Sequence, residues 1–159
     1  MALGTFVFNI AKGRAGELVK RVKDGDPSAA RLVAIPILSA GIEADSVLLD
    51  KDTVSALLSG ATDEATTGGW SRKVIAAADI TTPSPDDTND RFDYIFGDIT
   101  WTNVTAGAVT GLVIAYSPSD TSTGGDAANV PLTAHAWAIT PDGSDVTADV
   151  PATGFYRAS

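Results

Sequence analysis

The sequence predicts an α+β fold in which an N-terminal helix precedes a mainly antiparallel β-sandwich or curled sheet. A helical pattern stands near the start of the chain, and the last third consists of short β patterns separated by turn residues. The strands follow the helices in blocks instead of alternating with them, which disfavours a wound parallel sheet. The length of 159 residues suits a single domain covering residues 1–159.

The predicted N-terminal helix lies within residues 8–23. Asn9 is the candidate N-cap, and the turn residues at 25–27 are expected to end the helix. Small and apolar residues spaced by four, three and four positions share one face of this helix: Ala11, Ala15, Leu18 and Val22.

The other elements are predicted from apolar runs and the turn residues between them. Residues 31–38 form a strand in which Pro36 indicates an edge position or a bulge, because proline cannot donate a ladder hydrogen bond. Residues 53–58 form a short helix with Asp52 as the candidate cap. Further strands are expected at residues 72–76, 92–96, 100–104, 112–116, 131–139 and 155–159.

Three segments rich in turn residues are expected to be exposed loops, at residues 60–70, 81–90 and 117–129. The densest acidic group of the chain begins in the second loop. Carboxylate oxygens on a flexible loop suit Ca²⁺, although the spacing differs from the EF-hand pattern. A Ca²⁺ site and a solvated acidic loop, the favoured alternative, are the two interpretations of Asp86, Asp87, Asp90 and Asp93.

The net charge of −9 belongs to one half of the chain. Residues 1–73 contain nine basic and nine acidic residues, whereas residues 74–159 contain two basic and eleven acidic residues. An acidic half repels phosphate backbones, so no nucleic-acid partner is expected. The asymmetry fits either a soluble exterior or a neutral half that docks while the acidic half faces solvent. No apolar run approaches the ~20 residues that span a bilayer, so no membrane partner is expected.

Residues for reaction chemistry are sparse in this chain. Cysteine is absent, and the single histidine, His135, stands in the middle of a predicted strand. No Gly-x-Ser-x-Gly turn supplies a nucleophile for it, and one histidine excludes the common zinc sites. No phosphate-binding loop is present. The sequence therefore predicts no catalytic residue, no cofactor and no enzyme.

The tryptophans and tyrosines allow two interpretations. They could form a platform for carbohydrate, or they could pack inside the protein; they are Trp70, Trp101, Trp137, Tyr94, Tyr116 and Tyr156. They are far apart in the sequence and fall in or beside predicted strands, so packing is the favoured interpretation.

Several segments resemble a family of small virion structural proteins of tailed bacteriophages. The resemblance covers most of the chain, and its motifs are structural. The segments that carry it are residues 11–22, 86–93, 100–107, 111–116 and 141–159, which include Thr100-Trp-Thr-Asn-Val and Leu112-Val-Ile-Ala-Tyr. The resemblance implies a virion component on the capsid exterior that decorates or reinforces the shell, without a catalytic residue. A tail or head–tail junction protein is the first alternative, and a module that binds host glycans is the second.

The same resemblance implies the partners. The major capsid protein is the expected binding partner, and symmetry at capsid axes favours a homo-oligomer such as a trimer. The apolar residues Phe6, Phe8 and Ile10 in the neutral half are the candidate docking residues. Membership of the protein's own core is an equally weighted alternative for these three.

Overall fold

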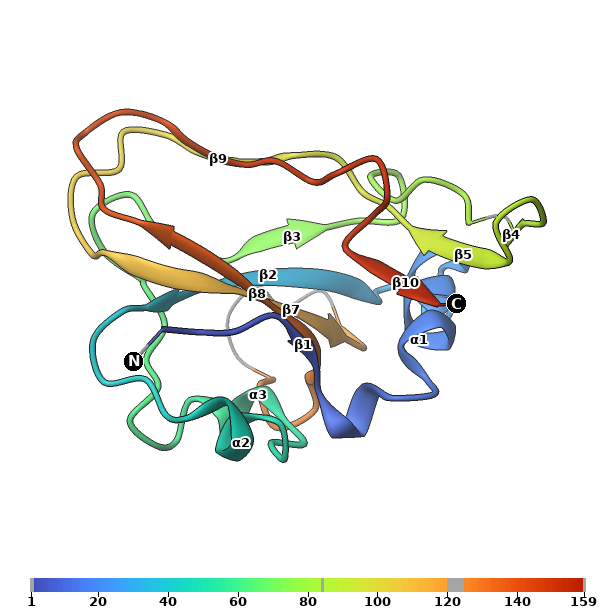
Figure 1. Ribbon diagram of the computed structural model, residues 1–159, viewed down its shortest axis with the longest axis horizontal. Helices are drawn as coiled ribbons and strands as arrows, with labels where there is room; N and C mark the ends of the chain where they lie inside the picture. Colours follow the sequence, from blue (N-terminus) through green and yellow to red (C-terminus); the bar gives the residue numbers. More distant parts are fainter. Residues whose placement is uncertain (1, 84, 120–124, 159) are drawn as a thin grey trace.

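The computed structural model describes residues 2–83, 85–119 and 125–158, which form mostly antiparallel sheet with few helices (Figure 1). This architecture agrees with an α+β or mainly β fold. The largest sheet has five strands in the order β1 (Phe6–Val7), β8 (Val130–Ile139), β7 (Val109–Ser117), β2 (Arg31–Leu38) and β3 (Lys73–Ile75).

Two smaller antiparallel sheets accompany the large one. The first contains β10 (Tyr156–Ala158), β5 (Arg91–Tyr94) and β4 (Pro85–Asp86), and the second pairs β6 (Ile99–Trp101) with β9 (Val146–Ala148). In Figure 1, β9 runs along one side of the large sheet, and the short helices α2 (Asp45–Leu48) and α3 (Val54–Leu57) lie along the other. The centre of the large sheet is therefore covered from both sides.

The predicted N-terminal helix is two elements. A 3₁₀ turn, η1 (Asn9–Ala11), is separated from α1 (Ala15–Asp24) by Gly13, whose φ of 81° lies outside helical geometry. Asn9 therefore does not cap α1, and its side chain donates to Asp50 instead. The helix ends at Gly25 in the left-handed conformation, as the turn residues predict. All four residues of the predicted apolar face are buried.

The second predicted helix is confirmed as α3, but its cap differs from the prediction. The hydroxyl oxygen of Thr53, not the carboxylate of Asp52, accepts the amide of Ala56 at 3.0 Å. The preceding helix α2 is not predicted from the sequence. Its N-cap, Ala44, makes no side-chain cap bond, so the usual signal for a helix start is missing.

Pro36 lies in an inner strand, so the expected edge position is wrong. The carbonyl of Pro36 accepts the amide of Ala65 on the side away from β7, and the proline nitrogen faces the same side. β3 ends before it reaches Pro36, since it pairs only with residues 32–34 of β2. The missing N–H therefore interrupts no ladder bond, and a register shift follows directly between Ile37 and Leu38.

The predicted loops differ in outcome. The segment 81–90 contains the short strand β4, so it is not wholly a loop, and residue 84 lies outside the described residues. Within the segment 117–129, residues 120–124 also lie outside the described residues. The strands β1 and β9 are not predicted from the sequence, because two or three residues are too few for a period to be recognised.

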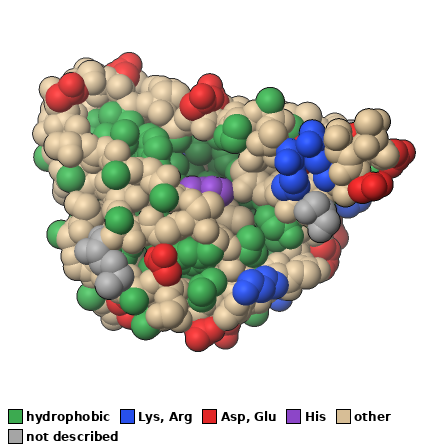
Figure 2. Space-filling model, viewed as in Figure 1, with side chains coloured by type: hydrophobic (Ala, Val, Ile, Leu, Met, Phe, Trp, Pro, Cys, Tyr) green, Lys and Arg blue, Asp and Glu red, His purple; other side chains and the backbone are tan. Residues whose placement is uncertain are grey.

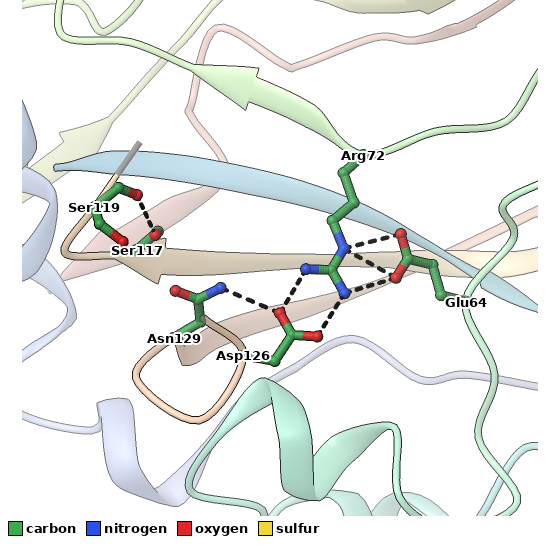
Figure 3. A network of polar contacts seen from close by, with 6 residues as sticks. All are labelled: Glu64, Arg72, Ser117, Ser119, Asp126 and Asn129. Atoms are coloured by element: carbon green, nitrogen blue, oxygen red, sulfur yellow. Dashed lines mark hydrogen bonds and ion pairs between the residues drawn. The ribbon is translucent and has the colours of Figure 1, made fainter. Parts of the chain in front are cut away.

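A buried network of charges ties three distant segments together (Figure 3). Arg72, just before β3, forms ion pairs with Glu64 at 2.7 Å and with Asp126 at 2.6 Å. The backbone carbonyls of Asp126 and Asn129 in turn accept the first two amides of α3. The network therefore holds the loop before β8, the loop before β3 and the start of α3 in one arrangement.

The electrostatics of this network favour the charged forms. Burial by itself lowers the pKa of the Arg72 guanidinium, but its hydrogen bonds with Asp126 and Glu64 outweigh burial and raise that pKa. The hydrogen bond from Arg72 lowers the pKa of Asp126 below 3.8. The stabilisation from Asp126 is therefore fully present above 3.8 and is lost as the pH falls through the lowered value.

Removal of the central cation should destabilise the fold. In Arg72→Ala the carboxylate of Glu64, with only 11% of its side chain exposed, loses its counter-charge. We expect the free energy of unfolding to fall by about 3–5 kcal/mol, because an unpaired buried charge is costly. Lys20→Ala, which breaks an exposed pair with Asp24, is the control and should cost less than about 1 kcal/mol. Urea unfolding followed by tryptophan fluorescence measures both, and equal losses would contradict the prediction.

Candidate functional site

A hollow of about 470 Å³ opens between β8 and the segment 148–157. Figure 2 shows the single histidine within it, with hydrophobic side chains on the surrounding walls. The largest apolar residues that line it are Phe96, Ile99, Leu112, Ile114, Trp137 and Phe155. A concave apolar site with a few polar groups is the usual form of a ligand-binding site.

The floor of the hollow is one face of the large sheet. Leu112 of β7 pairs with His135 of β8, and Ile114 pairs with Thr133, so these four side chains share a face. The opposite wall is held by Phe155, whose ring centroid lies 4.7 Å from that of Phe96.

A turn at residues 151–154 positions this wall. The amide of Gly154 donates to the carbonyl of Pro151 at 2.7 Å, and the amide of Phe155 donates to the carbonyl of Tyr94 at 3.0 Å. Gly154 has a φ of 79°, and a Cβ at this position would collide with the carbonyl oxygen of Tyr94. The close approach of the turn to β5 therefore requires glycine.

His135 is held within the sheet by its neighbour on the same face. Its Nε2 atom lies 2.8 Å from the hydroxyl oxygen of Thr133, as the alternation of strand residues predicts. Burial lowers the pKa of His135 below 6.5, so the imidazole is neutral at pH 7. A neutral imidazole can both donate and accept a hydrogen bond.

The pair of His135 and Thr133 lacks the geometry of a nucleophile and its base. Thr133 is buried and does not line the hollow, so its hydroxyl oxygen does not face the space open to a substrate. Within residues 2–83, 85–119 and 125–158, no carboxylate bonds to the second ring nitrogen of His135 to orient it. The pair therefore serves to fix the imidazole ring.

The four aspartates considered for Ca²⁺ lie on β4, on β5 and in the turn between them, and two of them form ion pairs with arginines. Arg91 lies 3.0 Å from Asp86 and 3.2 Å from Asp93, and Arg157 lies 2.6 Å from Asp93. Asp87 and Asp90 follow in the turn between β4 and β5. Among the described residues, no three acidic or histidine side chains form a group that could hold a metal ion. The structure thus gives Asp86 and Asp93 arginine partners in place of a shared cation.

The candidate docking residues lie in or against the protein's own core. Phe8 is fully buried, which corrects its assignment as a docking residue, because its ring is enclosed by the fold. Phe6 and Ile10 are half-buried and pack against the core, and the rings of Phe6 and Phe8 meet edge to face at 5.2 Å. This arrangement agrees with the core alternative for Phe8 and leaves only parts of Phe6 and Ile10 accessible.

The three tryptophans form one cluster, which sequence separation conceals. Trp70 and Trp101 are buried with ring centroids 5.3 Å apart, and Trp137 lies 6.0 and 5.7 Å from them. The indole N–H groups of Trp70 and Trp101 donate to backbone carbonyls of Gly107 and Ser71. These contacts agree with packing, and only Trp137 reaches the wall of the hollow. The three rings come from the loop before β3, from β6 and from β8, so their proximity leaves no local signal in the sequence.

No protein-family model matches the chain, and neither a curated protein nor a solved structure is significantly similar to it. None of the helices in the described part of the chain has the length and apolar character that a bilayer span requires.

The lowered pKa of His135 predicts a specific dependence of stability on pH. The unfolded chain binds this proton more readily than the folded chain, so stability is fully present above pH 6.5 and decreases as the pH falls toward the lowered value. We expect the free energy of unfolding to fall less between pH 7 and pH 5 in His135→Phe than in the unmodified protein. Urea unfolding at both pH values measures this, and an imidazole that titrates at or above 6.5 in an NMR titration would contradict it.

Proposed function

We propose that this chain is a non-enzymatic virion structural protein that binds the major capsid protein on the capsid exterior and decorates or reinforces the shell. The observation that carries the proposal is where the family-like segments lie in the fold. Residues 86–93 run from the last residue of β4 into β5, residues 111–116 form most of β7, and the segment 141–159 contains β9 and β10. Residues 11–22 include most of α1. The resemblance therefore falls on helices and strands of the framework and not on a reactive site.

The character of the framework supports a role in adhesion. The strands at the centre of the large sheet are buried, and a charged network joins the loops around them. We propose that the large sheet and the two small sheets form a curled sandwich, which would be a stiff support for a binding surface. A repeated lattice multiplies modest contacts, so each copy needs only a modest affinity. A cyclic homo-oligomer, such as a trimer, would match the symmetry axes of a capsid.

The number of copies in intact phage particles tests this proposal. We expect quantitative mass spectrometry of purified virions to give on the order of hundreds of copies, because a shell offers many equivalent sites. Peptides of the major capsid protein in the same sample serve as the internal standard. Cryo-electron microscopy should then place the chain on the outer surface of the capsid.

Other counts would point elsewhere. A few copies or dozens would favour a tail or head–tail junction protein, and absence from purified particles would overturn the proposal. A deletion of residues 1–10 is unsuitable as a test, because Leu3 and Phe8 are buried and their loss would destabilise the fold.

A further inference from the structure

The hollow beside His135 has the size and the lining of a binding site. Its volume of about 470 Å³ falls within the range of about 300–1,000 Å³ that is typical of such sites. Its walls come from six separate parts of the fold: the residue before β1, the segment after β5, the start of β6, β7, β8, and the segment from the end of β9 into β10. Because the turn that closes it depends on Gly154, the hollow is a built feature of the fold and not a gap beside a loose loop.

The charges at the border of the hollow are unequal. Arg157 is engaged with Asp93 through two hydrogen bonds, at 2.6 and 3.3 Å, so its charge is compensated. Asp149 also lines the hollow, and among the described residues its exposed carboxylate has neither an ion pair nor a hydrogen bond. Acidic side chains also lie above the hollow in Figure 2. A ligand with a positive charge next to its apolar part would complement this border.

We propose that this hollow receives one large apolar side chain of a partner protein, presented beside a lysine or arginine that pairs with Asp149. This inference rests on the proposed role of the chain as a protein that adheres to a partner. It names the contact surface and the chemistry of the segment that the surface accepts.

An apolar side chain suits the hollow better than a sugar does. Most of the side chains that line the hollow are aliphatic or aromatic, and those with polar groups are Thr5, His135, Asp149, Thr153, Tyr156 and Arg157. The hydroxyl of Thr5 already accepts the amide of Ala136 at 3.0 Å. Most hydroxyls of a bound sugar would therefore lose their hydrogen bonds to water without replacement, which is costly. An aromatic or branched side chain loses nothing of this kind, and its one polar atom, where it has one, can bond to the imidazole.

The single histidine makes the test specific to the site. Its ring-proton resonances in an NMR spectrum of the full chain report on this hollow alone. The probes are three peptides, acetyl-Lys-Trp-Lys-amide, acetyl-Glu-Trp-Glu-amide and acetyl-Lys-Ala-Lys-amide, each titrated at low ionic strength. We expect the first to shift the His135 resonances, the second to bind at least about tenfold more weakly because of charge, and the third to cause no shift.

Two pairs of variants separate the hollow from the rest of the surface. Thr153 lines the hollow, whereas Thr147 faces outward on β9 and bonds to the side chain of Thr100. Thr153→Trp should fill the hollow and abolish the shift, while Thr147→Trp should leave it unchanged. Should Thr153→Trp fail to fold, Asp149→Asn is the second variant, and it should weaken binding of the lysine–tryptophan peptide at least about threefold. The control is Asp24→Asn on α1, at a residue that does not line the hollow, and it should have no effect on binding.

The outcomes separate this inference from the proposed function. No shift with acetyl-Lys-Trp-Lys-amide, or equal binding of the three peptides, would overturn the inference while the copy number in particles still supports the proposed function. A specific shift in a chain that is absent from particles would support the binding site and overturn the virion role.

Discussion

The fold depends on one constraint: neither face of β7 is polar enough to be exposed to water. All nine residues of this strand are buried, so both faces of the large sheet need cover along its length. The hydroxyls of its buried threonine and serine have partners, since Thr110 accepts the amide of Leu3 and Ser117 donates to the carbonyl of Ser119. The segment before β1 and the helices cover one face, and the small sheets and the tryptophan cluster cover the other. The remaining elements therefore serve to cover the two faces of the large sheet.

The hollow is the place where that cover is incomplete. Thr133 is buried, whereas His135 and Trp137, which follow on the same face of β8, are only half-buried. The layer above this part of the sheet consists of a turn and a three-residue strand, β10, which are too short to fill the space. The charged network around Arg72 fixes the loops beside α3 instead. The part of the sheet beside His135 is left open.

The sequence predicts the parts of the fold whose signals are local. The strands β2, β7 and β8 are long apolar runs and are predicted correctly. The apolar face and the glycine end of α1 are also predicted correctly, but its start is not, because Gly13 separates it from η1. Elements of two to four residues, such as β1, β9 and α2, have no period to detect. The positions of β1 and β9 depend on pairing with the distant strands β8 and β6, and the tryptophan cluster and the hollow also combine residues that are far apart in the sequence. In the sequence, Asp86 and Asp93 resemble metal ligands, but in the fold their carboxylates form ion pairs with Arg91 and Arg157.

The energetics of a single apolar contact fit a chain that works in many copies. Burial of one large side chain contributes about 1.5–3 kcal/mol, and a surface ion pair adds at most about 1 kcal/mol. This total of about 1.5–4 kcal/mol does not exceed the 4.1 kcal/mol that corresponds to a dissociation constant of about 1 mM, and association itself costs free energy, so one hollow alone would hold a partner only briefly. In a cyclic oligomer on a lattice, the second and third contacts form within one complex at high effective concentration. Under the proposed function, one such contact on each copy would hold the chain on an array, while the free chain would not bind isolated partner subunits tightly.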